Sequence, residues 1–164
     1  EAVNRLKNSD ASYTFHGRDV YAYTGARLAA GEISFEEVGR LLPAEVVSIP
    51  FQRAIFADDE IQGNIPILDV QFGNVWTNID RETFRKLNPG RGTILRVQIS
   101  HGDETVFDQK LPYHDTFGAV EIGEPLVYLN SRNNVSLALN QGSFAAAHGI
   151  GSGSDWSIHI AVEK

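Results

Sequence analysis

The chain lacks cysteine altogether, and this absence removes two kinds of chemistry. Disulfide bonds cannot form, and there is no thiolate to act as a nucleophile or as a metal ligand. Because a chain without cysteine suits a reducing compartment, we expect a cytoplasmic protein.

Long apolar runs are also missing. No stretch approaches the roughly 20 residues that a helix needs to span a bilayer, and the first residues lack the basic and apolar blocks of a signal peptide. We therefore expect a soluble chain with no membrane contact. Methionine is absent even from position 1, which is Glu1, so we expect the sequence to be a processed chain or a piece of a longer one.

Basic residues are few. The chain has 14 Lys and Arg against 21 Asp and Glu, which gives a formal net charge of -7. Nucleic acids and anionic membrane surfaces are bound by clustered basic side chains, whereas these are scattered, so we expect no nucleic-acid partner. The histidines show no metal-ligand spacing, and we expect no metal.

The sequence does contain enough apolar residues for a core, with 42% hydrophobic content in 164 residues. Its first part predicts helices. Residues 20–30 are small and apolar, as in a buried helix. Ser34 and Glu37 form a capping box, which predicts a second helix that ends just before Pro43.

From Val46 onward the texture changes to short runs rich in Val, Ile, Phe and Leu, separated by Gly and Asn turns, which predicts mostly β-sheet. Apolar residues alternate with polar ones over 95–99, and a turn at 101–103 leads to a return strand, so we expect a hairpin. Asp80 is placed to cap a short helix over 81–87.

Three separated segments carry polar side chains within apolar sequence, at 14–19, 69–78 and 130–132, and together they predict one polar pocket. In the first, His16 has two interpretations. An isolated histidine in a turn is more often structural than functional. Here Gly17 leaves room for a ligand to approach the backbone, and the charged pair after it opens a helix, which favours a functional role.

The other two segments also leave alternatives open. Asp69 lies in an apolar run, where it either meets a ligand ammonium, faces solvent or pairs with an arginine. Asn74 offers a donor and an acceptor to a heterocycle edge, but also suits a turn after Gly73. Arg132 at a strand end is suited to holding a carboxylate, although surface arginines are commoner. Aromatic side chains that either stack on a base or fill the core are Phe72, Trp76 and Phe117.

At these segments the chain resembles the S-adenosyl-L-methionine (SAM) hydroxide adenosyltransferases, the adenosine-forming SAM hydrolases, whose relatives include the fluorinase and the chlorinase. Residues 14–19, Thr-Phe-His-Gly-Arg-Asp, resemble one family motif, and residues 69–78 resemble its D-x-x-F-G-N-x-x-T-N segment. Residues 130–132 and 140–143 resemble a late strand and the loop after it. The motifs occur in the family's order.

The resemblance implies an α+β fold, in which residues 1–45 are the tail of an α/β N-terminal domain and residues 46–164 are a β-rich, barrel-like C-terminal SAM-binding domain. It also implies a homotrimer whose active sites lie between the N-terminal domain of one subunit and the C-terminal domain of the next. The early Asp residues and the Gly-rich segment of the family's N-terminal domain are not in this sequence. This chain alone would therefore carry an incomplete site.

The resemblance also implies residue roles. His16 and Gly17 would lie beside the attacking water. Asp69 would receive the ammonium of the methionine part of SAM, and Ser131 with Arg132 would hold its carboxylate. Asn74 and the backbone around Leu139 to Gln141 would recognise adenine. Phe117 would stack on it, and Trp76 would wall the site.

The reaction implied is attack of water or hydroxide at C5′ of SAM, which gives adenosine and L-methionine with no cofactor besides the substrate. The fluorinase has Tyr-Ser where this chain has His16-Gly17, which favours hydroxide over fluoride. Chloride transfer stays open, because a Gly in this region also resembles the chlorinase. A third possibility is a non-catalytic module that binds SAM or adenosine.

Overall fold

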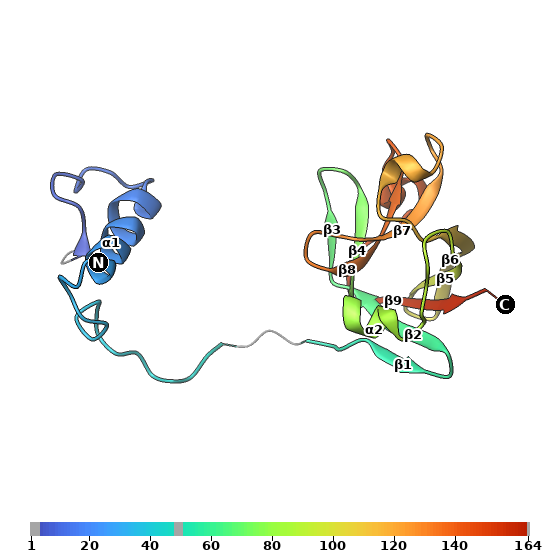
Figure 1. Ribbon diagram of the computed structural model, residues 1–164, viewed down its shortest axis with the longest axis horizontal. Coiled ribbons are helices and arrows are strands. Elements are labelled where there is room, and N and C mark those ends of the chain that lie inside the picture. The colour runs from blue at the N-terminus through green and yellow to red at the C-terminus, as the bar shows by residue number, and fades with distance from the viewer. Residues whose placement is uncertain (1–3, 48–50, 164) are drawn as a thin grey trace. The chain divides into compact units, whose positions relative to one another are not determined.

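The computed structural model describes residues 4–47 and 51–163. The chain forms two compact units, Glu1–Ile49 (unit 1) and Pro50–Lys164 (unit 2), drawn in Figure 1. The wider assignment of the first residues to a larger α/β domain stays a prediction. No helix in the described ranges is long and apolar enough to cross a membrane.

Unit 1 contains the first expected helix, but the expected burial is wrong for α1, which has no buried residue. It begins as a π-helical turn, η2 (Gly17–Ala22), and continues as α1 (Tyr23–Ala29). The second expected helix, after Ser34, does not form, and residues 32–47 make only turns and bends. Half of the capping box is present, since the Ser34 N–H donates to Glu37 Oε2 at 2.8 Å. The segment from Ser34 to Pro43 is short and contains Gly39, so it cannot repay helix nucleation and the capping box closes one turn only.

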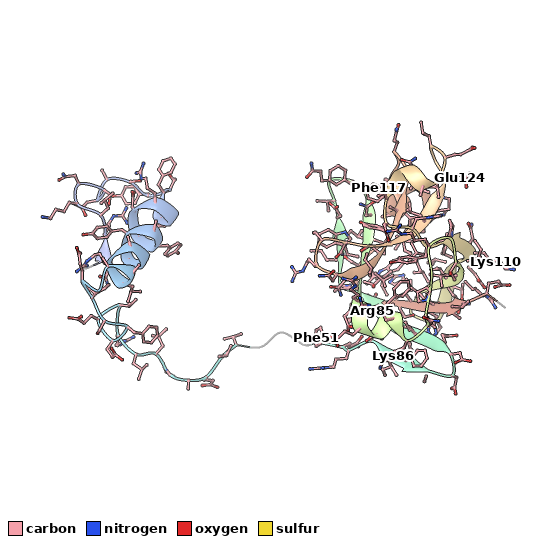
Figure 2. The ribbon with its side chains drawn as sticks, in the orientation of Figure 1. Phe51, Arg85, Lys86, Lys110, Phe117 and Glu124 are labelled. Carbon is pink, nitrogen blue, oxygen red and sulfur yellow. The ribbon has the colours of Figure 1, made fainter. Side chains whose placement is uncertain are left out.

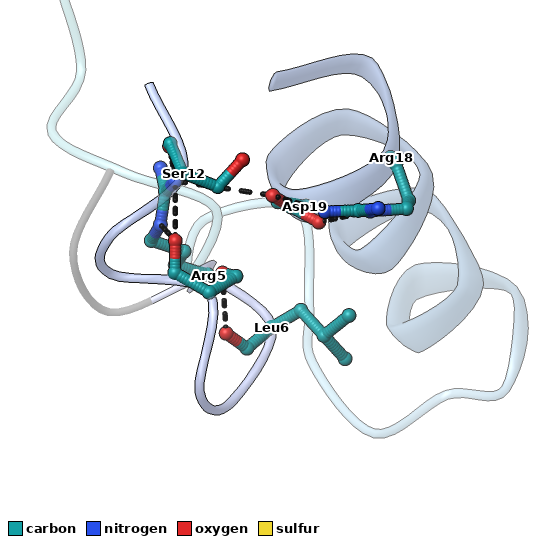
Figure 3. A network of polar contacts seen from close by, with 6 residues as sticks. Arg5, Leu6, Ser12, Arg18 and Asp19 are labelled. Carbon is teal, nitrogen blue, oxygen red and sulfur yellow. Dashed lines mark hydrogen bonds and ion pairs between the residues drawn. The ribbon is translucent and has the colours of Figure 1, made fainter. Parts of the chain in front are cut away.

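A buried carboxylate holds the start of this helix in place (Figure 3). The side chain of Asp19 is fully buried, and the Arg18 guanidinium donates to it through Nε at 2.5 Å and Nη2 at 3.0 Å. Arg5 lies 4.0 Å from the same carboxylate, and the Leu6 N–H donates to the Asp19 carbonyl at 2.8 Å. The hydrogen bonds from Arg18 hold the pKa of Asp19 below its ordinary value of 3.8.

Unit 2 consists of two antiparallel sheets (Figure 1). The five-stranded sheet has the order β1-β2-β9-β5-β6, and the four-stranded sheet has the order β3-β4-β8-β7. The strands are β1 (Ile55–Ala57), β2 (Glu60–Ile65), β3 (Ile67–Asp69), β4 (Asn74–Asp80), β5 (Ile94–His101), β6 (Glu104–Pro112), β7 (Pro125–Leu129), β8 (Asn134–Leu139) and β9 (Gly153–Val162). The expected hairpin is confirmed as β5 and β6.

One hydrophobic cluster takes side chains from both sheets. The alternating residues of β5 and β9, among them Val97 and Ile160, meet those of β4 and β8, among them Val75 and Leu137, all with no exposed surface. Gly63 on β2 lies so close to β4 that an added Cβ would sit 2.7 Å from Ile79, so only glycine lets the strands approach here. The two sheets therefore share one core.

Short helices close the edges of this core. In α2 (Arg81–Arg85), Asp80 is the N-cap as expected, and its side chain accepts from the Thr83 N–H. Helix α3 (Phe144–His148) is capped by Ser143, whose hydroxyl accepts from the Ala146 N–H. A 3-10 turn, η3 (Phe117–Ala119), lies between β6 and β7.

The expected barrel-like closure is not found, because within the described residues the strands form two separate sheets and no closed barrel. Strand β6 ends at Pro112, which has no N–H to donate to a neighbouring strand. Directly after it, Tyr113 forms a single isolated bridge to Val127 of β7. Strands β6 and β7, at the edges of the two sheets, are thus not paired along a ladder of hydrogen bonds.

We expect the Asp19 carboxylate to make the helix of unit 1 acid-sensitive. Because the pKa of Asp19 is lower in the folded state than in the unfolded state, its stabilising contribution is complete above pH 4. It is lost as the pH falls through the folded-state value. The protection factors of amides 17–29, which are exchange rates corrected for the intrinsic effect of pH, should therefore fall on acidification.

In Asp19→Asn, the protection factors of the same amides should be low already at pH 6 and should change little between pH 6 and pH 3. The matched control is Asp10→Asn, since Asp10 is exposed. Equal protection of wild type and Asp19→Asn at pH 6 would contradict this account of the helix.

Candidate functional site

Strand β4 carries the candidate site on the face opposite the core. Val75 and Thr77 point inward, and the Thr77 hydroxyl donates to the Val135 carbonyl at 2.8 Å. The alternate residues Asn74 and Trp76 therefore point to the outer face of the four-stranded sheet. Asn74 is 5% exposed, so its amide is nearly enclosed before any ligand binds. We call this outer surface the ligand face.

The turn between β3 and β4 is fixed against helix α3. The Gly73 N–H donates to the Asp69 carbonyl at 2.7 Å, and the Gly73 carbonyl accepts from the Ala145 N–H at 2.9 Å. Gly73 has φ of +70°, and an added Cβ would lie 1.9 Å from the Ser143 hydroxyl. Glycine is thus needed here both for the left-handed backbone and for the close contact. This packing brings residues 70–74 beside residues 139–143.

Between these two segments lies a cavity of about 620 Å³, the amide pocket. None of its lining residues is charged. Its side-chain amides belong to Gln71, Asn74, Asn140 and Gln141, and its aromatic rings belong to Phe72 and Phe117. Both rings are exposed, at 61% and 42%, so they do not belong to the core. An uncharged pocket of amides and rings suits a neutral heterocycle, which needs donors, acceptors and stacking.

The turn between β7 and β8 forms the other end of the ligand face. Asn130 is buried, and its Oδ1 accepts from the backbone N–H of Arg132 at 2.9 Å and of Asn134 at 3.1 Å. Its Nδ2 donates to the Ser136 hydroxyl at 2.9 Å. Sequence reasoning gave Asn130 no role. The structure shows that it shapes the turn that carries Ser131 and Arg132.

A second cavity, of about 460 Å³, adjoins this turn, and we call it the charged pocket. Trp76, Asn78 and Arg132 line it, with Phe51, Ile67 and Asp80. Asp80 is already engaged as the cap of α2, and the hydrogen bond from the Thr83 N–H lowers its pKa. Phe51 and Phe117, which line different pockets, lie well apart in Figure 2. The ligand face thus has two chemically different ends.

Two opposite charges near the pockets lack partners. Within the described part of the chain, the half-buried Asp69 carboxylate and the exposed Arg132 guanidinium take part in no ion pair or side-chain hydrogen bond. The alternative that Asp69 pairs with an arginine is therefore not supported. Neither Asp69 nor Ser131 lines the two cavities, although Asp69 is the direct strand partner of Asn74.

Tyr128 is a residue that sequence reasoning missed. It lies on β7, is 8% exposed, and packs with Leu126 and Ala138 on the ligand-face side of the sheet. Burial raises the pKa of Tyr128, and the charge of Asp69 adds to this, whereas the Trp76 side chain opposes it. In the sequence, Tyr128 has the pattern of an ordinary core residue, so only the sheet register could reveal its position.

The remaining predicted residues, His16 and Gly17, belong to unit 1. His16 is half-buried and is the N-cap residue of η2, with no capping hydrogen bond from its side chain. Gly17 is exposed, and an added Cβ would meet no atom within 4 Å. In residues 4–47 and 51–163, no group of three His, Cys, Asp or Glu side chains is arranged to hold a metal ion.

Comparison with known proteins shows which family the chain resembles. The family described as SAM hydroxide adenosyltransferase C-terminal domain matches residues 63–157, which include the whole lining of the amide pocket and that of the charged pocket except Phe51. The chain is 37% identical over 143 residues to a fluorinase of Actinopolyspora mzabensis, covering 85% of this chain and 46% of the relative. It is 31% identical over 140 residues to an (R)-S-adenosyl-L-methionine hydrolase of Thermus thermophilus, covering 85% of this chain and 47% of that one.

A crystal structure of an uncharacterized conserved protein from Thermotoga maritima is also similar, with a TM-score of 0.66 and 32% identity. That match covers 96% of this chain and 57% of the other. The chain spans about half the length of the curated relatives that it matches. By the domain match, which spans more than half of its residues, the chain belongs to the SAM hydroxide adenosyltransferase family, and its relatives are fluorinases and SAM hydrolases.

Proposed function

We propose that the protein containing this chain hydrolyses SAM to adenosine and L-methionine. The observation that carries the proposal is the chemical division of the ligand face. SAM has a neutral heterocycle at one end and a zwitterionic amino acid at the other. The face offers an uncharged pocket at one end, and a pocket with an unpaired guanidinium at the other.

The two ends of SAM require the hydrogen-bonding and charged groups that the two pockets offer. In the amide pocket, Asn74 and Gln141 offer the donors and acceptors that an adenine edge requires, and Phe117 offers a ring for stacking. In the charged pocket, Arg132 is suited to two parallel hydrogen bonds with a carboxylate. Asp69 lines neither pocket, and binding of the ammonium by its unpaired carboxylate stays part of the proposal.

The reaction then follows from the sulfonium of SAM. Hydroxide, or water that loses a proton, forms a bond to C5′, the C5′–S bond breaks, and methionine leaves as a neutral thioether. Both ends of the substrate are anchored, so positioning of C5′ supplies part of the rate. Exclusion of water from a cationic substrate contributes further. No metal or redox step is needed for this displacement.

We assign orientation or deprotonation of the attacking water to His16, with Gly17 leaving space beside it. A histidine is suited to this role because its pKa lies near neutrality. The support is the match of residues 14–19 to the family motif together with the half-buried position of His16 at the start of a helix. We also propose a homotrimer, which sedimentation or light scattering of the full-length protein can test.

Halide transfer is the second candidate, and one observation favours it. The fluorinases match this chain at 34% to 38% identity, whereas the SAM hydrolases match at 30% to 31%. Against it stands the His16-Gly17 pair, which replaces the fluorinase residues at the position of the nucleophile. Overall identity reflects the whole chain, while the nucleophile depends on these few residues, so hydrolysis is the better supported function.

The product formed from SAM distinguishes the candidates. We expect the full-length protein to release adenosine and methionine at equal rates, with the same product in buffer and in 1 M chloride or fluoride. Chromatography with mass detection measures this directly, and heat-inactivated protein is the control. A halogenated nucleoside that grows with halide concentration would establish halide transfer. Tight binding of SAM without any turnover would leave only the binding-module function.

We expect Arg132→Gln to weaken binding of the amino-acid end alone. Loss of a charge-assisted bond of about 1.5–3 kcal/mol corresponds to a roughly 10- to 150-fold higher dissociation constant for SAM and for methionine. Adenosine affinity should stay within about twofold, because the amide pocket is at the other end of the face.

Titration calorimetry of the full-length protein measures both constants. The matched control is Arg85→Gln, because Arg85 is an exposed arginine on α2 outside both pockets (Figure 2). An equal loss of adenosine affinity in Arg132→Gln, or no loss for methionine, would refute the assignment of the two ends.

A further inference from the structure

Tyr128 lies at the centre of the ligand face although it lines neither pocket. In the strand register it is the direct partner of Ser136 on β8, and Ser136 is the partner of Trp76 on β4. Directly paired residues project to the same face of a sheet. Tyr128, Ser136 and Trp76 therefore form one row across three strands, with the tyrosine at one end and the indole at the other.

The indole of Trp76 needs an acceptor in this row. Its Nε1 is buried and makes no hydrogen bond of normal geometry with the described residues. A buried N–H without an acceptor costs about 1–3 kcal/mol. The Tyr128 hydroxyl has the side chains of Trp76, Ser136 and Asn74 around it, and each of them acts on its pKa as a hydrogen-bonding group. The Ser136 hydroxyl is already the acceptor for Asn130 Nδ2 at 2.9 Å.

The ring of Tyr128 contacts Phe117, one of the two aromatic residues of the amide pocket. Phe117 packs edge-on against it, with ring centroids 5.0 Å apart and an interplanar angle of 72°. Phe117 lines the amide pocket, whereas Trp76 lines the charged pocket. The ring of Tyr128 thus contacts one aromatic wall of the amide pocket, and Tyr128 shares a row of the sheet with Trp76, which lines the charged pocket.

We propose that Tyr128 is a positioning residue of the ligand face. In solution its hydroxyl accepts the hydrogen bond of Trp76 Nε1–H, which has no partner among the described residues here, and fixes the tilt of the indole, while its ring supports Phe117. The two aromatic walls are thereby held at a constant separation, which suits a ligand that contacts both. The positioning itself is a property of the free chain; its consequence for affinity rests on the proposed function.

The substitution Tyr128→Phe tests the hydrogen bond, because it removes the hydroxyl and keeps the ring. The chain has two tryptophans, so its ¹H–¹⁵N spectrum contains two indole signals. In Tyr128→Phe the Trp76 indole proton should move upfield, as expected on loss of an acceptor. The Trp156 indole should not move, because Trp156 belongs to the five-stranded sheet.

The matched control is Tyr113→Phe. Tyr113 contacts Phe84 with the same centroid distance of 5.0 Å and the same angle of 72°, but away from the ligand face. Both indole signals should keep their wild-type positions in this variant. A Trp76 signal that is unchanged in a folded Tyr128→Phe chain would overturn the proposal.

Affinity supplies the second readout. In the full-length protein, the adenosine dissociation constant should rise about three- to tenfold in Tyr128→Phe, as for loss of one neutral hydrogen bond. It should stay unchanged in Tyr113→Phe. Wild-type affinity in Tyr128→Phe would overturn the role in binding. If wild type binds no adenosine, the proposed function fails, while the indole signals still decide whether Tyr128 holds Trp76.

Discussion

The alternation of side chains along β4 is the constraint on which the rest of unit 2 depends. One strand must fill the core with Val75 and Ile79 and present Asn74 and Trp76 to a ligand on the other side. A slip of one residue in its register would exchange the two sets and destroy the core and the face together. Gly63, where β2 approaches β4 too closely for any side chain, keeps the two sheets in place around it.

The ligand face separates its chemistry by position. Its amide pocket is uncharged and is built from two segments that Gly73 brings into contact with helix α3. Its charged end depends on a turn that the buried Asn130 organises from within. Because these supports are backbone contacts and buried hydrogen bonds, the face is largely formed before a ligand arrives. Preorganisation of this kind lowers the entropic cost of binding.

Local patterns in the sequence predicted much of this structure. The β5–β6 hairpin follows from alternation, the cap at Asp80 from the chemistry of helix N-termini, and the helix before Gly31 from its small and apolar residues, all of which act over a few residues. The helix predicted from the capping box at Ser34 was wrong, because a cap lowers the free energy of a helix but does not repay the cost of its nucleation. Closure of a barrel and the place of Tyr128 depend on pairing between distant strands, which no single-sequence pattern reports. The motifs located Asp69, Asn74, Trp76 and Arg132, while their roles in binding stay predictions.

The most direct test of the account is a crystal structure of the full-length protein with adenosine and methionine bound together. We predict adenine in the amide pocket, against Asn74 and Phe117, and the methionine carboxylate on the guanidinium of Arg132. The sulfur of methionine and C5′ of adenosine should face each other between the two pockets. Adenine bound elsewhere, or a carboxylate that does not contact Arg132, would contradict the assignment of the ligand face.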